Sequence, residues 1–370
     1  IYIKKMDSDF KTNGSEIELT NVYIKDSVIY HNYTKENLYY SGRYNDFNTP
    51  KDVDDINFYF GWRIQKNDGI IPINPEIIEK PNQLVLCCFF DKHYVHCWES
   101  LLPLYFKKDQ DINDVYILNY SETDNLPCNV GLVNYLRTLL PKCQFHFNCK
   151  NGIFLSKCTL VGRRRLDGLS GNWFQNAHIQ KEFIQGLFNF YNIKQLDSIN
   201  KKDFLVGIII RKGSREIKNI DFIKNNVKEM GGKTIDLDYN KMTFKEQIIN
   251  THKVNILIGS HGAGLVNSLF LRDKSAVIEI NSYLLVDHYY SNLVMAKSSD
   301  LFYQFVQSYE FPHNIFISKN INQDINLLKC RHSHIVTKCH SNPLIFDEIH
   351  FHYSLLYCLQ HLILNNIIDK

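Results

Sequence analysis

The 370-residue sequence lacks the features that mark a membrane-spanning, repetitive or nucleic-acid-binding protein. It contains no run of about eighteen apolar residues, the length that a transmembrane helix needs. No repeat with a period of roughly 20–50 residues is present. The formal net charge is only +3, so overall charge does not favour nucleic acid or an anionic membrane as a partner. Any anion-binding site must therefore be local.

Cysteine content leaves the cellular compartment open. Ten cysteines fit either free thiols or several disulfides, and short separations make Cys143/Cys149 and Cys330/Cys339 candidate pairs. The chain begins at Ile1, so a signal or anchor segment could precede it. We expect the lumen of the ER or Golgi if such an anchor exists, with membrane attachment through that segment alone, and the cytoplasm otherwise.

Length and composition predict a globular protein with two domains. Residues 1–80 are polar and rich in Tyr and Asn, which indicates an irregular or partly β lead-in. Alternating apolar patterns predict one α/β domain over residues 81–200 and another over 201–345. Residues 346–370 contain an amphipathic helix.

Alternation of strands and helices determines where ligands should bind. The expected strands are 84–90, 114–120, 144–149, 158–162, 204–210, 233–237, 254–259 and 276–280, and the expected helices are 94–106, 129–140, 178–191, 219–230, 243–253 and 264–271. In the second domain this order predicts parallel strands with right-handed crossovers. All strand-to-helix loops then lie at one edge of the sheet, where ligands bind.

The most informative segment is 254–271, an apolar strand followed by a glycine-rich turn and an apolar helix start. Backbone N–H groups and the positive end of a helix dipole favour an anion at such a place. Gly262 and Gly264 allow close approach of the backbone, and His261 adds a side-chain donor. A turn that serves packing alone is the alternative. The pattern predicts a phosphate site made by His261 and the N–H groups of Gly262, Ala263 and Gly264.

Further polar residues should share this crevice. Arg211 directly follows the strand 204–210, where its guanidinium can contact two phosphate oxygens, and Arg215 lies in the same loop. Asn281 follows the strand 276–280. The alternatives are a surface ion pair for Arg211 and a solvated side chain for Arg215.

These motifs resemble the family 61 glycosyltransferases. Within that family the pattern is most similar to the branch with protein O-mannose β-1,4-N-acetylglucosaminyltransferase and the plant β-xylosyltransferases. The segments that carry the resemblance are EQI, HGAGLVN and an apolar strand ending in Glu279 within 243–280, IIIRKGSREIKN, NWFQN, HCWESLLPLYF and DHYYSNLVMAKSSDLFY. They cover about residues 84 to 306. One departure is that His96 precedes Glu99 by three residues, where relatives commonly have four.

The resemblance implies an α/β protein of GT-B fold, with two Rossmann-like domains facing a cleft and a C-terminal helix that crosses back to the first domain. It implies an inverting transferase without a metal ion or other cofactor, which moves GlcNAc or, as second choice, xylose from a UDP-sugar. The expected acceptor is a hydroxyl group of a glycan or glycoprotein. The oligomeric state is left open.

The resemblance also suggests roles for single residues. The expected donor-binding residues are Arg211, Arg215, His261, Gly262, Ala263, Gly264, Glu246 and Asn281. Glu99 is the expected general base, with His96 on the same helix face as the other possible proton acceptor, and Trp173 and Gln175 would line the acceptor side. Simpler explanations exist for three of them: a capping box with Thr243 for Glu246, a helix-end contact for Glu99, and core packing for Trp173.

Several other motifs have a plainer explanation. Asp7-Ser8-Asp9 mimics a metal-binding DxD but fits a solvated turn. The ligand-rich segment Cys330, His332, His334, Cys339 and His340 lacks the spacing of structural zinc sites. Arg163–Arg165 fits a solvated face better than a nucleic-acid contact. The rival functions are a non-catalytic sugar- or nucleotide-binding protein of the same fold and a dehydrogenase, which the absence of GxGxxG disfavours.

Overall fold

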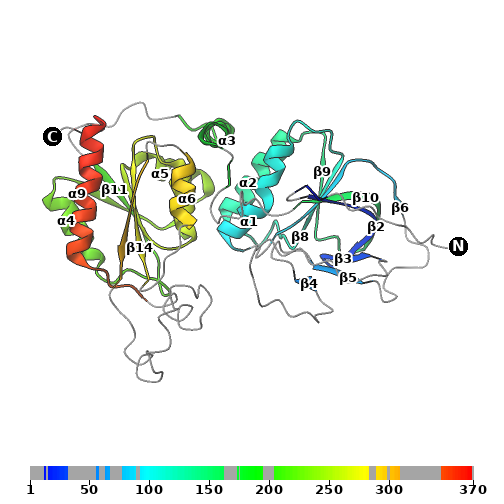
Figure 1. The fold of residues 1–370 in the computed structure, drawn as a ribbon, viewed down its shortest axis with the longest axis horizontal. Helices are drawn as coiled ribbons and strands as arrows, with labels where there is room; N and C mark the ends of the chain where they lie inside the picture. Colours follow the sequence, from blue (N-terminus) through cyan, green and yellow to red (C-terminus); the bar gives the residue numbers. More distant parts are fainter. Residues whose placement is uncertain are drawn as a thin grey trace, which may run out of the picture. The chain divides into compact units, whose positions relative to one another are not determined.

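A computed structural model places the chain in two compact units, Ile1–Leu169 and Ser170–Lys370 (Figure 1). The structure describes residues 12–13, 16–31, 56–57, 63–66, 77–88, 92–161, 173–174, 176–194, 204–282, 289–297, 301–308 and 343–368. Helix α3 (Ala177–Phe190) lies in the second unit and packs against its helix α6 (Tyr289–Lys297). The division therefore comes before α3, earlier than the predicted boundary near residue 200.

A mixed β-sheet forms the first unit. Its strands are β1 (Thr12–Asn13), β2 (Glu16–Lys25), β3 (Val28–His31), β4 (Ile56–Asn57), β5 (Arg63–Lys66), β6 (Ile77–Ile78), β7 (Gln83–Cys87), β8 (Asp114–Leu118), β9 (Gln144–Phe147) and β10 (Ile153–Val161). In the described ranges the order is β4-β5-β3-β2-β10-β7-β8-β9. Strands β10, β7, β8 and β9 are parallel, whereas β2 is antiparallel to β10. The segment before residue 80 thus supplies strands to the sheet.

Helices α1 (Tyr94–Leu101) and α2 (Pro127–Leu139) connect the parallel strands of the first unit and pack against each other. The single helix predicted over 94–106 is interrupted. The α-helix ends at Leu101, and the chain continues as the 3₁₀ helix η1 (Leu102–Lys107). Pro103 explains the break, because proline has no N–H group and its ring clashes with the preceding turn of an α-helix.

The candidate disulfide between Cys143 and Cys149 is not formed, and both residues are free thiols. They lie at opposite ends of strand β9, which has four residues. A strand of that length separates its ends by roughly 13 Å, and two cysteines that far apart cannot be bridged. The other candidate pair, Cys330 and Cys339, lies outside the described residues.

A five-stranded parallel sheet forms the second unit, in the order β12-β11-β13-β14-β15. The strands are β11 (Leu205–Ile209), β12 (Lys233–Leu237), β13 (Ile256–Ser260), β14 (Ala276–Asn281) and β15 (Phe302–Gln307). Every residue of β13 and β14 is buried, as expected for strands with both faces covered. The predicted parallel, Rossmann-like sheet is confirmed.

Helices cover both faces of this sheet. Figure 1 shows α4 (Ile220–Glu229) and α9 (Glu348–Leu364) on one face, and α5 (Phe244–Lys253) and α6 on the other. The predicted capping box at the start of α5 is confirmed, since Thr243 and Glu246 bond each other's backbone N–H groups. None of the helices in the described ranges is long and apolar enough to cross a bilayer.

Residues 264–271, predicted as an α-helix, form part of the 3₁₀ helix η4 (Ala263–Phe270) instead. The Asn267 side chain donates to the carbonyl oxygen of Gly264, at 3.1 Å. In an α-helix that oxygen would accept from the backbone N–H of Ser268, so the Asn side chain competes with α-helical bonding. The first N–H groups of η4 still lack partners within the helix, as at any helix start.

Helix α9 packs on the second sheet. Asp347 caps its start by accepting from the N–H of His350, and Phe351, Leu355 and Leu362 lie in the same core as strand residues of this unit. The short 3₁₀ helix η3 (Tyr239–Lys241) follows β12. The prediction that the C-terminal helix returns to the first domain is not confirmed, because its buried face contacts the sheet of its own unit.

Candidate active site

Strands β11 and β13 meet at the point where the strand order of the second sheet reverses. From β11 the chain proceeds to β12 on one side, and from β13 it proceeds to β14 on the other. In open parallel sheets such a reversal leaves a crevice at the carboxyl ends of the two strands, where ligands bind. Arg211 follows β11 and His261 follows β13. Both residues therefore lie at the edge where a ligand is expected.

The two loops contact each other directly. Arg215 donates from Nη1 to the backbone carbonyl oxygen of His261, at 2.7 Å. The Arg211 guanidinium lies against Gly262, so closely that a Cβ atom there would be 2.6 Å from Nη1. A side chain at this position would require the guanidinium to move, whereas glycine allows the close approach. The structure thus brings together Arg211, Arg215 and the glycine turn, as the sequence predicts.

The arginine loop is tightly folded. Arg211 donates from Nε to the carbonyl oxygen of Ser214. Arg215 has a φ of 59°, in the left-handed region that residues other than glycine seldom adopt. Such a conformation costs on the order of 1 kcal/mol or more and occurs preferentially at functional sites. The strain at Arg215 is consistent with a binding role.

Both guanidinium groups are partly desolvated. Burial lowers the pKa of Arg211, and burial together with the positive charge of Arg211 lowers the pKa of Arg215 to about 10. Tyr290 acts in the opposite direction on both. In the part of the chain that the structure describes, no carboxylate lies within salt-bridge distance of Arg211. Two neighbouring positive charges in this setting favour an anionic ligand.

A buried carboxylate orients His261. Its Nδ1 is in hydrogen-bond contact with Oε1 of Glu279, which is fully buried in β14. The Tyr290 ring packs against the imidazole edge-on, with centroids 5.0 Å apart. Because Nδ1 is engaged by Glu279, a hydrogen bond from His261 to a ligand would use Nε2. The sequence-based prediction assigned no role to Glu279 or Tyr290, although a single acid in the apolar run AVIEI was a detectable signal.

Asn281 ends strand β14 at the same edge of the sheet and is almost fully buried. Its backbone carbonyl oxygen accepts from the N–H of Ser308, at 2.9 Å. The side-chain Oδ1 has no hydrogen-bond partner within the described ranges. A buried amide oxygen of this kind costs free energy unless something satisfies it, so Asn281 remains a candidate for ligand contact.

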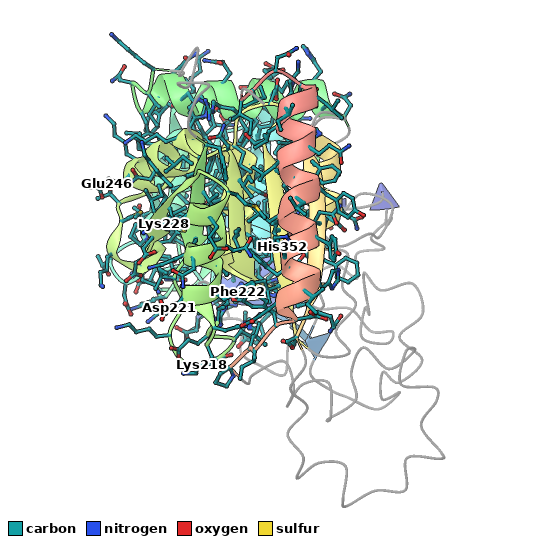
Figure 2. The ribbon with its side chains drawn as sticks, turned by 90° about the vertical axis from the view of Figure 1, so that its left-hand side faces the viewer. Lys218, Asp221, Phe222, Lys228, Glu246 and His352 are labelled. Atoms are coloured by element: carbon teal, nitrogen blue, oxygen red, sulfur yellow. The ribbon has the colours of Figure 1, made fainter. Side chains whose placement is uncertain are left out.

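Glu246 and Trp173 have different environments. Glu246 is exposed in its capping box, and Figure 2 shows it at the periphery of the second unit. Trp173 is fully buried, and its Nε1–H donates to the hydroxyl of Tyr289 at 3.1 Å, which matches the core-packing alternative. Gln175 lies outside the described residues. The structure therefore does not bring Glu246 or Trp173 to an exposed part of the arginine site.

In the first unit, His96 and Glu99 lie on the same face of α1. Nδ1 of His96 is 3.4 Å from Oε2 of Glu99. Glu99 is fully buried, whereas the His96 side chain is about a quarter exposed, at 26%. The His93 ring stacks on His96, with centroids 4.4 Å apart. Of the two predicted base candidates, only His96 is partly exposed in this structure.

Metal-binding clusters of three or more His, Cys, Asp or Glu side chains are not found among the described residues. Three motifs from the sequence lie outside the described residues: the DxD mimic at 7–9, the basic triplet at 163–165 and the ligand-rich segment at 330–340.

Comparison with known proteins gives an independent view of the same residues. The family model Glycosyltransferase 61 matches residues 94–278, which is half of the chain. This range runs from α1, with His96 and Glu99, to β14, and includes both arginines and the histidine turn.

Related proteins are similar over a shorter stretch. The EGF domain-specific O-linked N-acetylglucosamine transferase of Mus musculus is 35% identical over 112 residues, covering 29% of this chain and 21% of that protein. The proteins of the same name from Rattus norvegicus and Gallus gallus are 34% identical over 110 and 106 residues. The match thus spans about a fifth of the length of these relatives. The nearer likeness to the protein O-mannose and plant xylosyl enzymes stays a prediction. Together with the family model over half of the sequence, these matches show that the chain belongs to glycosyltransferase family 61.

Proposed function

We propose that this chain transfers a sugar from a UDP-sugar to a hydroxyl group of a glycan or glycoprotein, with inversion and without a metal ion. The observation that carries the proposal is the contact of Arg211 and Arg215 with the turn at Gly262 and His261. A departing nucleotide diphosphate needs its negative charge stabilised in the transition state. Paired guanidinium groups and the N–H groups at a helix start supply that stabilisation.

The name of the relatives supports the proposed donor and acceptor. Their name describes transfer of N-acetylglucosamine to EGF domains, which supports UDP-N-acetylglucosamine ahead of UDP-xylose and a glycoprotein as acceptor. The proposal includes the GT-B fold. It also includes the lumen of the secretory pathway as the compartment, if an anchor precedes the chain.

His96 is the proton acceptor in this proposal and Glu99 positions it. With Nδ1–H held by the buried Glu99 carboxylate, Nε2 of His96 takes the proton of the acceptor hydroxyl. The hydroxyl oxygen attacks the anomeric carbon of the donor sugar as the bond from that carbon to the diphosphate oxygen breaks. The electron pair leaves with the diphosphate, whose charge is balanced by Arg211 and Arg215.

A donor panel tests this function. The protein is incubated with UDP-N-acetylglucosamine, UDP-xylose and other nucleotide sugars, and released UDP is measured with and without glycoprotein acceptor. We expect turnover of UDP-N-acetylglucosamine, lost in Arg211→Ala and kept in Lys212→Ala, an exposed lysine in the same loop. Binding of UDP without turnover of any donor would favour the non-catalytic alternative, which the altered spacing of His96 and Glu99 motivates.

A further inference from the structure

Helix α9 carries an exposed apolar surface. In the described part of the chain six large hydrophobic residues are exposed, and five of them are on this helix. They are Ile349, Tyr353, Leu356, Tyr357 and Leu364, with exposed fractions between 40% and 72%. Large apolar side chains gathered on one exposed surface mark an interaction site more often than scattered ones do.

These residues form one stripe, opposite the buried face of the helix. At 100° per residue they fall within an arc of about 100°, and Gln360, also exposed, lies inside the same arc. Phe351, Leu355, Cys358 and Leu362 lie on the other side, in the core of the second unit. A helix that is apolar on both faces is normally covered on both.

The rotation of α9 about its axis is fixed by its flank. His352 Nδ1 lies 3.0 Å from Nδ2 of Asn226 on α4, and Figure 2 looks onto this side of the unit with α9 in front of the sheet. Because one side of α9 packs in the core and His352 contacts α4, the apolar stripe must face outward. The stripe is separate from the arginine site.

We propose that the stripe binds the same stripe of a second copy of this chain, with the two α9 helices antiparallel about a two-fold axis. Such an interface is self-complementary, so residue i must face residue j while j faces i. The stripe has this symmetry about the point between Leu356 and Tyr357. Ile349 and Leu364 are equally far from that point, and so are Tyr353 and Gln360. Ile349 then faces Leu364 and Leu356 faces Tyr357, while Tyr353 faces Gln360.

Charge also favours a second copy over a membrane. Helix α9 contains no Lys or Arg and one acidic residue, Glu348, at its first position. Amphipathic helices that bind anionic membranes carry Lys and Arg on their polar side, which α9 lacks. In an antiparallel pair Glu348 would face Asn365, so no carboxylate, Lys or Arg would face a like charge.

The size of the stripe sets the expected strength. One pair of 17-residue helices buries less than the roughly 1,600 Å² of a standard interface. Interfaces of that small class are weak, so we expect a dissociation constant on the order of micromolar. The dimer should be visible above this concentration and dissociate on dilution.

Sedimentation equilibrium between about 0.5 and 100 μM tests the proposal with the full chain. We expect a mass that rises with concentration toward twice the 43.5 kDa of one chain. Ile349→Glu and Leu364→Lys should each weaken association at least about tenfold, because each places a charge against an apolar residue of the other copy. Equal mixing of the two variants should restore association, since Glu at 349 then faces Lys at 364.

The control is Phe305→Glu. Phe305 is also exposed, but it lies on the face of β15 opposite to Phe302, which stacks on His361 of α9. This variant should dimerise like the unchanged protein. A wild-type monomer at 100 μM would overturn the proposal and indicate that a different partner covers the stripe. Failure of the mixed variants to associate would overturn the antiparallel pairing.

Discussion

The guanidinium of Arg215 donates a hydrogen bond to the backbone carbonyl oxygen of His261, 46 residues further along the chain. This bond joins the loop after β11 to the turn after β13, at the reversal point of the second sheet. It places two arginines and a histidine of the family motif in one site.

Replacing Arg215 should change the stability of the fold little and weaken ligand binding strongly. Its pKa is about 10 in the folded chain and 12.5 ordinarily, so the folded state holds this charge less favourably at every pH below about 10. That unfavourable contribution is relieved only as the pH rises through 10 toward 12.5. Loss of the charge in Arg215→Gln therefore offsets loss of its hydrogen bond. We expect the free energy of unfolding to change by less than about 1 kcal/mol.

The same variant should lose its response to ligand. Thermal unfolding with and without UDP provides the measurement: saturating UDP raises the Tm of the unchanged protein and of Lys212→Ala, and has little effect on Arg215→Gln. An equal rise in Tm for all three proteins would remove Arg215 from the site.

Gly262→Ala tests the close approach of the Arg211 guanidinium. The added methyl group would lie 2.6 Å from Nη1, so the guanidinium must move. We expect UDP to bind about 10 to 100 times more weakly. Gly264→Ala is the comparison, because its methyl group would meet the side chains of Ile209, at 3.1 Å, and Tyr239, at 3.6 Å, and neither arginine. Calorimetric titration showing the larger loss for Gly264→Ala would contradict this geometry.

The paired roles of His96 and Glu99 predict different kinetic defects. His96→Ala should lower kcat on the order of 100-fold or more, with UDP affinity unchanged because the arginine site is untouched. Glu99→Gln keeps a hydrogen-bonding side chain in the buried position and should lower kcat less, with a changed pH profile. Steady-state rates over pH 5–9 distinguish the two. Normal kcat in His96→Ala would show that another group takes the proton.

Cys143 offers a pH-dependent check of the first unit. Burial, with a smaller effect of the Asp114 charge, raises the pKa of this thiol to about 11. Less thiolate is then present at any lower pH, so its alkylation rate should rise about tenfold per pH unit from 7.5 to 10. Mass spectrometry of the peptide after brief iodoacetamide treatment measures this rate. An alkylation rate that reaches a plateau near pH 8.5 would indicate an exposed thiol. No alkylation at any pH would indicate that Cys143 is in a disulfide.

Local patterns predicted the second sheet well. The runs FLVGIII, KTIDL, VNILIG and AVIEI are apolar and bounded by polar turns, and they became the parallel strands β11 to β14. Strand-to-helix loops of parallel strands share one edge, so the meeting of Arg211 with the histidine turn followed from topology alone. The capping box that holds Glu246 was also predictable, because it depends on only four consecutive residues.

What depends on long-range packing was not predictable. The choice between a 3₁₀ and an α-helix at η4 is influenced by one side-chain bond, from Asn267 to Gly264. His96 is partly exposed and Glu99 is buried. Which of the two is exposed depends on how α1 is rotated about its axis against its neighbours. Tyr290 reaches His261 from a separate helix, and no local pattern links the two residues.

The central claim is that the two arginines and the glycine turn bind a diphosphate. Calorimetric dissociation constants of UDP and of uridine, for the unchanged protein and for Arg211→Ala, test it most directly. Charge-assisted hydrogen bonds contribute about 1.5–3 kcal/mol each, so UDP should bind the unchanged protein on the order of 100 times more tightly than uridine. That preference should largely disappear in Arg211→Ala, and an equal preference in both proteins would contradict the account.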